Sequence, residues 1–515
     1  MKKNVVFLKL ILLIFTTTLV ISCNNDDDNV IPVGPKPTGN EIVYDLKSVS
    51  DPAISGTATV IEIDDNSITV ELDLNNTAAA GSHPAHIHIN TAAEGGAIAI
   101  TLGTVDGATG LSTINFSAMD NGTAITYQQL LNFDGYINVH QSAADLETII
   151  AQGDIGQNEL TGESKTYELH SVAVEDIDGT ATFEKRKNGE ALATLQINNT
   201  ADGDIHPAHI HENTAIESGD IIFTFNPVNG TTGTSKTNVS SLDDDTAFGY
   251  DEVLDVNGYI NVHQSATELG TLIAQGDIGG NELSGESKVY ELLEKDVPGI
   301  SGTATLEERL NGTTLVTLAL EGTTAGGIHP AHIHENDAAT GGDIVRTFNP
   351  VNGTTGISMT QVGSLDDATS ITYTELLTFD GYINVHLSAA QLNVLVAQGN
   401  IGSNEGPPAT INYDITNNGE IAYIFNGDGL VDVSNPAITL TRGSTYTFTV
   451  NAPGHPFYIK TIQGIGTVNP YNTGVTNNGA FNGTVTFTVP QDAPDLLYYN
   501  CEFHAVMTNT ITIID

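Results

Sequence analysis

A thiol, two imidazoles and a thioether occur close together near the end of this chain. Cys501, His504 and Met507 have the spacing C-x₂-H-x₂-M, and His455 lies 46 residues before the cysteine. Cysteine and two histidines with a weak axial methionine are typical of blue-copper electron-transfer sites, because this ligand set suits both Cu(I) and Cu(II). The chain holds only two cysteines and four methionines. The pattern therefore predicts one copper ion, and the alternative is a metal-free fold with a buried free cysteine.

The remaining histidines are arranged in a repeating pattern. The segment His83-Pro84-Ala85-His86-Ile87-His88 recurs twice at an offset of 123 residues, and so does the segment from Gly135 to His140. Twelve of the 15 histidines occupy four equivalent positions in these three units. An H-x-H pair on a strand points both side chains to one side, and a histidine on a neighbouring strand can join them.

Two roles are open for three of these histidines in each unit. They can bind a divalent metal ion through imidazole nitrogen, or they can donate hydrogen bonds to backbone carbonyl groups and tie loops to the sheet. We favour the structural role, since no cysteine is near and the acids Glu212 and Glu335 have no counterpart at Ile89. The histidines concerned are His86, His88, His140, His209, His211, His263, His332, His334 and His386.

The constant offset determines the predicted domain organisation. A period of 123 residues is too long for a solenoid repeat and suits a domain of ordinary size. We therefore predict three copies of one domain, followed after Glu405-Gly406-Pro407-Pro408 by a different one. The predicted boundaries are 41–163, 164–286 and 287–405 for the repeats and 408–515 for the last domain.

Within each copy the hydrophobic pattern is that of β-structure. Ile68, Val70, Leu72 and Leu74 alternate with polar residues, which predicts a half-buried strand. A turn cluster at 64–67 joins this strand to the preceding apolar segment as a hairpin. Only the segments 127–132 and 143–151 favour helix, and both are short. The prediction is an all-β protein of four antiparallel β-sandwich domains in tandem.

The other cysteine follows a predicted signal peptide. Residues 1–22 combine Lys2 and Lys3 with an apolar stretch that is too short to span a bilayer comfortably. Val20-Ile21-Ser22-Cys23 resembles the bacterial lipobox, which implies diacylation of Cys23 and attachment to a membrane. Residues 23–40 then form a predicted acidic, flexible tether. With Cys23 acylated, Cys501 has no partner for a disulfide within the chain.

Charge excludes one class of partner. The chain carries 16 basic and 63 acidic residues, a formal net charge of −47. Nucleic acid is excluded as a partner, because phosphate binding needs basic patches. Acidity of this kind is typical of a soluble, surface-exposed protein. No catalytic constellation is present in the sequence, so we do not predict an enzyme.

The repeated motifs resemble a known domain family. His-Pro-Ala-His-Ile-His followed by Gly-Tyr-Ile-Asn-Val-His resembles the CHRD (chordin) domain, with its H-I-H and Y-V-N-V-H segments. The resemblance covers about residues 41–405 in three copies. The usual G-E-I-R-G-Q ending of the family is replaced by the segment 151–156 and its equivalents. The resemblance implies extracellular domains that act as a stalk or a binding array.

The last domain resembles a cupredoxin of the plastocyanin/azurin type, a small Greek-key sandwich. The resemblance assigns Cys501 as thiolate ligand, His455 and His504 as imidazole ligands, and Met507 as axial ligand. The spacing from His504 to Met507 is two residues shorter than in plastocyanin. Expected strands are 444–450, 484–489, 496–500 and 509–514.

Together these features predict an exported outer-membrane lipoprotein of the cell envelope, exposed at the surface. Its last domain would bind copper for electron transfer or copper handling, and would exchange electrons with a redox partner protein. The alternative is a structural or adhesive surface protein without a redox role. The sequence does not name a ligand for the repeats.

Overall fold

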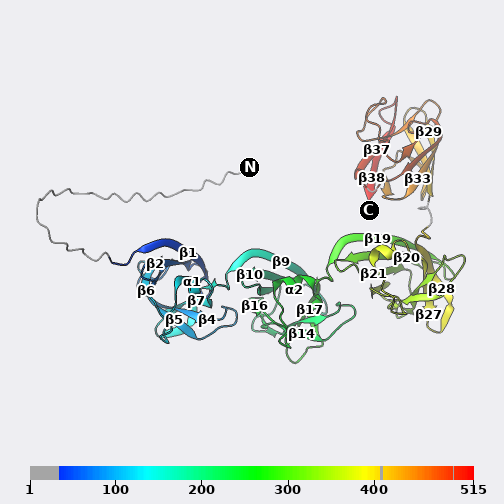
Figure 1. Cartoon of the computed structure of the whole chain (residues 1–515). Helices are drawn as coiled ribbons and strands as arrows, with labels where there is room; N and C mark the ends of the chain where they lie inside the picture. The colour runs from blue at the N-terminus through cyan, green and yellow to red at the C-terminus, as the bar shows by residue number, and fades with distance from the viewer. Residues whose placement is uncertain (1–33, 406–409, 491, 515) are drawn as a thin grey trace, which may run out of the picture. The chain divides into compact units, whose positions relative to one another are not determined.

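The computed structural model describes residues 34–405, 410–490 and 492–514, and these are almost entirely β-structure (Figure 1). The predicted signal peptide and Cys23 lie outside the described residues. The chain divides into two compact units, Met1–Thr161 with Arg186–Asn188, and Gly162–Lys185 with Gly189–Asp515. Four separate hydrophobic cores lie within these units, one for each predicted domain. The all-β fold class is thereby confirmed.

The first repeat is one antiparallel sheet that curls until its two end strands meet. Its strands are β1 (Pro37–Ser48), β2 (Ser55–Ile63), β3 (Ile68–Asn75), β4 (Ser82–Ile89), β5 (Ile98–Asp106), β6 (Leu111–Phe116), β7 (Asp134–Ser142) and β8 (Asp145–Gly156). Their order in the sheet is β5-β4-β7-β8-β1-β2-β3-β6, and the terminal strands β5 and β6 contact one another. The curled sheet encloses a single core, into which a short helix, α1 (Tyr127–Leu130), contributes Leu130.

The burial observed in β3 follows the alternation of apolar and polar residues that predicted this strand. Ile68, Val70, Leu72 and Leu74 are at most 3% exposed, whereas Glu71 and Asp73 between them are exposed. The hairpin with β2 forms as predicted, and its turn uses Asn66 at a φ of 68°. Asparagine tolerates this left-handed conformation better than most residues do. The equivalent strand of the third repeat buries Val316, Leu318 and Leu320 in the same way.

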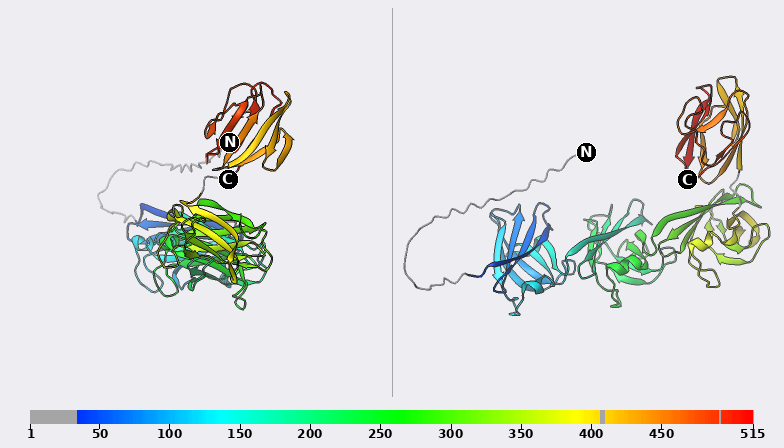
Figure 2. Two further views of the ribbon diagram at one scale, coloured as in Figure 1. Left: turned by 90° about the vertical axis from the view of Figure 1, so that its right-hand side faces the viewer. Right: turned by 45° about the horizontal axis from the view of Figure 1, so that its top comes forward.

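The second and third repeats follow the same plan, with small differences at the sheet edges (Figure 2). The second contains β9 (Leu160–Ser171), β10 (Gly179–Arg186), β11 (Ala191–Ile197), β12 (Ile205–His206), β13 (Ala208–Glu212), β14 (Ile221–Thr224), β15 (Val228–Asn229), β16 (Thr234–Val239), α2 (Tyr250–Asp255), β17 (Asn257–His263) and β18 (Leu272–Gly279). The third contains β19 (Leu283–Glu294), β20 (Ser301–Arg309), β21 (Thr314–Glu321), β22 (Ile328–His329), β23 (Ala331–Glu335), β24 (Ile344–Thr347), β25 (Val351–Asn352), β26 (Ile357–Val362), α3 (Tyr373–Leu376), β27 (Asp380–Ser388) and β28 (Gln391–Gly402).

Two local predictions were wrong. The segment 143–151 is not helical, because residues from Asp145 onward belong to β8. β-Branched residues lie in its middle, and its pairing with β7, in which Val139 faces Ala151, overrides the local helix propensity. The predicted tether also ends earlier than residue 40, since β1 begins at Pro37. Thr38 and Asn40 donate hydrogen bonds to the Glu62 carboxylate at 2.8 and 2.7 Å, which fixes this end of the strand.

The last domain packs two sheets face to face. Its strands are β29 (Thr410–Asn418), β30 (Ala422–Gly427), β31 (Leu430–Ser434), β32 (Ile438–Thr441), β33 (Thr445–Asn451), β34 (Phe457–Lys460), β35 (Val475–Thr476), β36 (Asn482–Thr488), β37 (Leu496–Cys501) and β38 (Thr508–Ile514). One sheet has the order β31-β30-β29-β33-β36-β35 and the other β32-β38-β37-β34. The four strands expected from the sequence are all present.

This last domain differs from a purely antiparallel sandwich. β29 pairs with β33 in parallel, and β32 pairs with β38 in parallel. A parallel pair needs a crossover connection, and here the intervening strands provide it by passing between the two sheets. The core between the sheets is rich in aromatic rings, among them Tyr423, Phe425, Phe457 and Tyr499, all fully buried.

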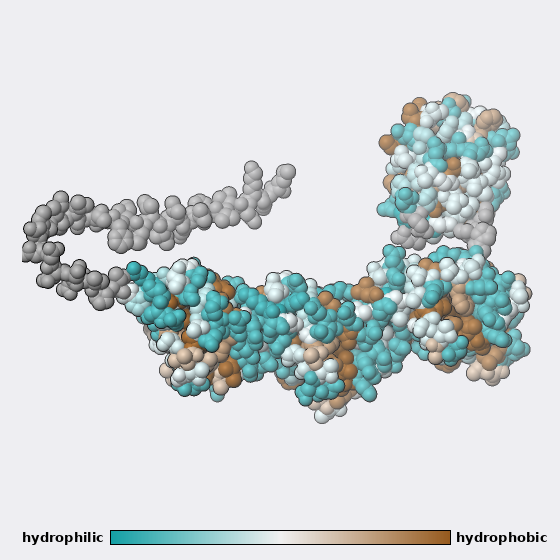
Figure 3. Space-filling model, in the orientation of Figure 1, coloured by the Kyte–Doolittle hydropathy of each residue, from teal (hydrophilic) through white to brown (hydrophobic). Residues whose placement is uncertain are grey.

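Hydrophilic side chains cover much of the face seen in Figure 3, as the acidic composition leads one to expect. Within the described ranges, the helices are all too short to reach across a bilayer.

Candidate metal centres

In the described part of the chain, four groups of histidine and cysteine side chains bring ligand atoms within 4.8 Å of one another. One is His455, Cys501 and His504 in the last domain. The other three are equivalent histidine triads, one in each repeat, and they are named here the His₃ clusters. Their members are His86, His88 and His140; His209, His211 and His263; and His332, His334 and His386.

Strand pairing assembles the cluster of the last domain. Cys501 is the final residue of β37, and it lies opposite Phe457, the first residue of β34. His455 comes two residues before Phe457 and therefore lies beside the end of β37. His504 lies in the loop between β37 and β38, which also leads to Met507.

The ligand atoms of this cluster converge. The Nδ1 atoms of His455 and His504 are 3.0 Å apart, and they lie 3.8 and 3.5 Å from the Cys501 Sγ atom. Metal–nitrogen bonds of about 2.0–2.1 Å and a metal–sulfur bond of about 2.3 Å place ligand atoms roughly 3.3–3.8 Å apart around one ion. The three atoms therefore already have nearly the separation that a shared ion requires.

Two side chains outside the cluster hold the ligand loops, the fully buried Tyr423 and the half-buried Asn435. The hydroxyl of Tyr423 donates to the carbonyl oxygens of His455 and Pro456 at 2.9 and 3.0 Å. The side-chain amide of Asn435 donates to the Val506 carbonyl at 3.0 Å. Burial, and then the neighbouring Cys501, raises the pKa of Tyr423, so its hydroxyl stays protonated and remains a donor. The sequence analysis missed both residues, because neither belongs to a motif.

Exposure differs among the four predicted ligands. Cys501 is 1% exposed and His455 is 7% exposed, whereas the side chain of His504 is 24% exposed. Burial, and then the neighbouring His504, lowers the pKa of His455, which favours the neutral imidazole that a metal needs. Met507 is fully buried, and its carbonyl oxygen accepts a hydrogen bond from the Cys501 amide at 3.0 Å. This bond joins the backbones of the two residues.

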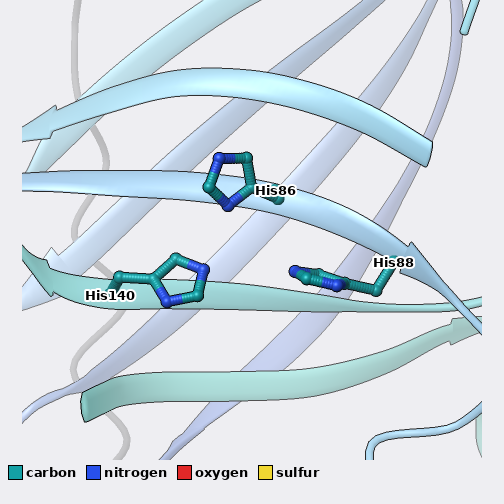
Figure 4. A group of neighbouring side chains, drawn as sticks. All are labelled: His86, His88 and His140. Atoms are coloured by element: carbon teal, nitrogen blue, oxygen red, sulfur yellow. The ribbon is translucent and has the colours of Figure 1, made fainter. Parts of the chain in front are cut away.

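Each His₃ cluster comes from two neighbouring strands. In the first repeat, His86 and His88 lie on β4 and His140 lies on β7, and their rings face one another (Figure 4). The ring centres of His86 and His140 are 5.0 Å apart. Antiparallel pairing of β4 with β7 sets His86 opposite Asn138, which brings His140 within reach.

Hydrogen bonds orient the rings in the same way in every copy. His88 Nδ1–H donates to the Gly96 carbonyl at 2.9 Å, and His140 Nδ1–H donates to the Leu146 carbonyl at 2.7 Å. In the second repeat His209 Nδ1 lies 3.0 Å from His263 Nε2, and in the third the equivalent distance is 3.1 Å. Figure 4 shows the corresponding ring nitrogens of the first repeat turned toward the shared space.

Burial lowers the pKa of several cluster histidines and so favours their neutral form. Burial, and then the neighbouring imidazoles, lowers the pKa of His209 and of His332 to about 4. The pKa of His86 is lowered by the same two causes. Burial also lowers the pKa of His140, against the hydrogen bond to the Leu146 carbonyl. Neutral imidazole is the form that binds metal ions.

The fourth repeated histidine has a different position. His83 donates from Nδ1 to the carbonyl oxygens of Gln141 and His140, at 2.9 and 3.3 Å, and so ties β4 to the end of β7. It lies outside the cluster, as do the equivalent His206 and His329. His170, which has no equivalent in the other repeats, is exposed.

Comparisons with known proteins add little to this description of the sites. No family model matches the chain, and no curated protein matches it. Among the solved structures that match is one described as "Biofilm associated protein - BSP domain", at 10% sequence identity. The match covers 92% of this chain and 96% of that chain, with a TM-score of 0.11. At that score the similarity carries no argument about fold or function.

Proposed function

We propose that this chain is an exported, lipid-anchored protein of the cell envelope whose cupredoxin-like last domain binds one copper ion. The observation that carries the proposal is the convergence of His455 Nδ1, Cys501 Sγ and His504 Nδ1, which lie 3.0 to 3.8 Å apart. The three CHRD-like repeats then serve as a stalk or binding array, and Cys23 carries the lipid.

The donor set fits copper better than a hard cation. A thiolate and two imidazoles are soft and borderline ligands, whereas calcium and magnesium prefer oxygen. Copper, when bound, supplies one-electron transfer between Cu(I) and Cu(II). Cys501 and His455 are buried, so they hold the site away from water. Met507 would supply a weak fourth donor.

The chain's own groups keep the site ready for binding. Tyr423 fixes the His455 backbone, and Asn435 fixes the loop that carries His504. Because both loops are held by side chains that do not bind metal, little rearrangement is needed when a ligand atom is engaged. Such preorganisation favours electron transfer, for which the site must change little between oxidation states.

His504 gives the proposed route for electrons. It is the most exposed of the three converging residues, and Phe503 and Val506 on either side are 57% and 62% exposed. Two exposed apolar side chains beside a partly exposed ligand fit transient docking of a redox partner protein, since weak electron-transfer encounters use small interfaces. Storage or delivery of copper would use the same ligands and needs no docking surface of this kind.

The experiment is a titration of the purified full chain with Cu(II), followed by visible absorption. We expect an intense sulfur-to-copper charge-transfer band that rises to saturation and is lost in Cys501→Ser. Copper bound by histidines alone gives only weak visible absorption, so the band reports on Cys501. His170→Gln is the control, because this histidine is exposed and outside every cluster. A chain that gives no such band would leave the structural or adhesive role as the better account.

A further inference from the structure

We propose that each of the three repeats holds one transition-metal ion of the Zn(II) or Cu(II) class on its His₃ cluster. This inference replaces the structural role favoured from the sequence alone. It goes beyond the copper site of the last domain and uses none of its residues. It rests on the direction in which the ring protons point, on the separation of the inward nitrogens, and on the recurrence of both features in three copies.

The ring protons point away from the centre of each cluster. A carbonyl oxygen can only accept, so His88 and His140 must carry their protons on Nδ1 to donate to Gly96 and Leu146. In the neutral form of these rings, the Nε2 atom therefore carries a lone pair. Both Nε2 atoms are buried without a hydrogen-bond partner, and so is His86 Nδ1.

Hydrogen bonding within the cluster cannot satisfy all of these atoms. Only the third ring, that of His86 or its equivalents, can turn an N–H proton inward. This one proton cannot satisfy the Nε2 atoms of both other rings well. In the second repeat the contact of His209 with His263 leaves His211 Nε2 buried and unpartnered. A buried polar atom without a partner is destabilising by about 1–3 kcal/mol. In the third repeat the side-chain amide of Asn384 donates to His334 Nε2 at 3.4 Å, so the deficit belongs to the first two copies. A cation that binds all three lone pairs removes the deficit there.

The separations suit a single ion. All three ligand atoms of each cluster lie within 4.8 Å of one another, and one pair of nitrogens is 3.0 Å apart in the second repeat and 3.1 Å apart in the third. Nitrogens bound tetrahedrally at about 2.0–2.1 Å lie roughly 3.3 Å apart. The closest pairs are slightly shorter than this value, and the widest are at most 4.8 Å apart.

The ring orientation is supported by neighbouring groups. Tyr136 stacks on His88 with ring centres 5.0 Å apart, and its hydroxyl accepts a hydrogen bond from the Gly96 amide at 3.0 Å. The Gly96 carbonyl thus accepts the hydrogen bond from His88, and the Gly96 amide holds Tyr136, which packs on the His88 ring. A Cβ at Gly96 would lie 2.0 Å from the Ile89 carbonyl oxygen, so only glycine fits there. Tyr259 and Tyr382 repeat the arrangement in the other two copies.

The ligand type sets the class of ion. Three neutral imidazoles without a carboxylate or a thiolate suit zinc and copper among the late first-row metals, and they leave a fourth position open to water or a small ligand. One carboxylate lies near each cluster. Its negative charge raises the pKa of His86, His209 or His332, which opposes the effect of burial. The three carboxylates are Asp120, Asp243 and Asp366.

The test uses the full chain carrying Cys501→Ser, so that the copper site of the last domain is removed. The protein is loaded with ZnSO₄, desalted and analysed for metal content, and its histidine ligation is read by X-ray absorption. We expect about three equivalents of zinc per chain. His88→Ala, His211→Ala and His334→Ala should each remove one equivalent, and the triple variant should retain none.

The matched control replaces the three buried histidines outside the clusters, His83, His206 and His329, by glutamine. This control should still hold about three equivalents. Circular dichroism checks folding, and His140→Gln serves as a second variant if His88→Ala fails to fold. Retention of less than half an equivalent by the parent chain would overturn the proposal. Zinc content that is unchanged in the triple variant would also overturn it, because surface carboxylates would then be the ligands.

Discussion

The single O–H proton of Tyr423 is shared between the carbonyl oxygens of His455 and Pro456, at 2.9 and 3.0 Å. A side chain on β30 thus fixes the loop that brings His455 to Cys501, although 32 residues separate Tyr423 from His455. Fully buried tyrosine hydroxyls usually find a partner, and here the partner is the backbone of a proposed ligand.

Tyr423→Phe should therefore weaken copper binding as well as stability. We expect a loss of about 1–2 kcal/mol in the free energy of unfolding, since two buried carbonyl groups lose their donor. Copper affinity, measured by competition with a chelator, should fall too. Tyr413→Phe is the control, because its hydroxyl binds Asp428 at 2.7 Å and not the ligand loop. Equal copper affinity in both variants would show that Tyr423 does not position His455.

Met507→Leu should raise the reduction potential of the bound copper while leaving the charge-transfer band in place. Removal of a weak axial donor favours Cu(I), and the potential of such sites is tuned by the axial ligand. Met507 is fully buried, and leucine of similar volume should change stability by less than about 1.5 kcal/mol. Met359→Leu, at a position 46% exposed in the third repeat, should leave the potential unchanged. A potential unaffected by Met507→Leu would remove this residue from the ligand set.

Arg309→Ala should strongly destabilise the unit that contains it. This guanidinium is 1% exposed, and it donates to the Asp277 carboxylate at 2.8 Å and to the Gln361 side chain at 2.7 Å. Loss of one partner of a buried ion pair is destabilising by about 3–5 kcal/mol. Lys288→Ala should have an effect below about 1 kcal/mol, because its pair with Glu405 is more than a third exposed. Thermal unfolding that is similar for the two variants would contradict this difference.

Stability should fall at alkaline pH through the buried tyrosines. Burial raises the pKa of Tyr167 from 10 to about 12, so between these values the folded state keeps a proton that the unfolded state releases. Folding therefore loses free energy as pH rises above 10, and the loss is complete near pH 12, at a maximum of about 3 kcal/mol. Denaturant unfolding from pH 8 to 12 measures it. Tyr167→Phe should show a smaller slope with pH, and an identical slope would exclude this tyrosine as a cause.

Cys23→Ala should release the protein from membranes. The prediction depends on the lipobox-like segment before Cys23, and no other part of the sequence is apolar enough to anchor the chain. Detergent partitioning of cell extracts measures the effect, and Cys501→Ser is the control that leaves the anchor intact. Unchanged partitioning of Cys23→Ala would rule out the lipid anchor.

The sequence by itself determined the number of repeats, the fold class and the residue types of each site. Exact spacing of 123 residues between histidine motifs shows the copies directly, and the alternation in strands such as β3 follows from burial of one face. It also placed Cys501 and His504 three residues apart. These properties depend on residues close together in the sequence or on a repeated spacing, so composition and spacing are enough to predict them.

Tertiary structure decided what local sequence could not. Pairing with β7 made residues 145–151 a strand despite their helical composition, and crossing between sheets produced the parallel pair of β32 and β38. Pairing of β4 with β7 brought His140 to His86, and backbone carbonyls at Gly96 and Leu146 turned the ring protons outward. The physical reason is that strand partners and backbone acceptors come from distant parts of the chain, so their effect on a side chain exists only after folding.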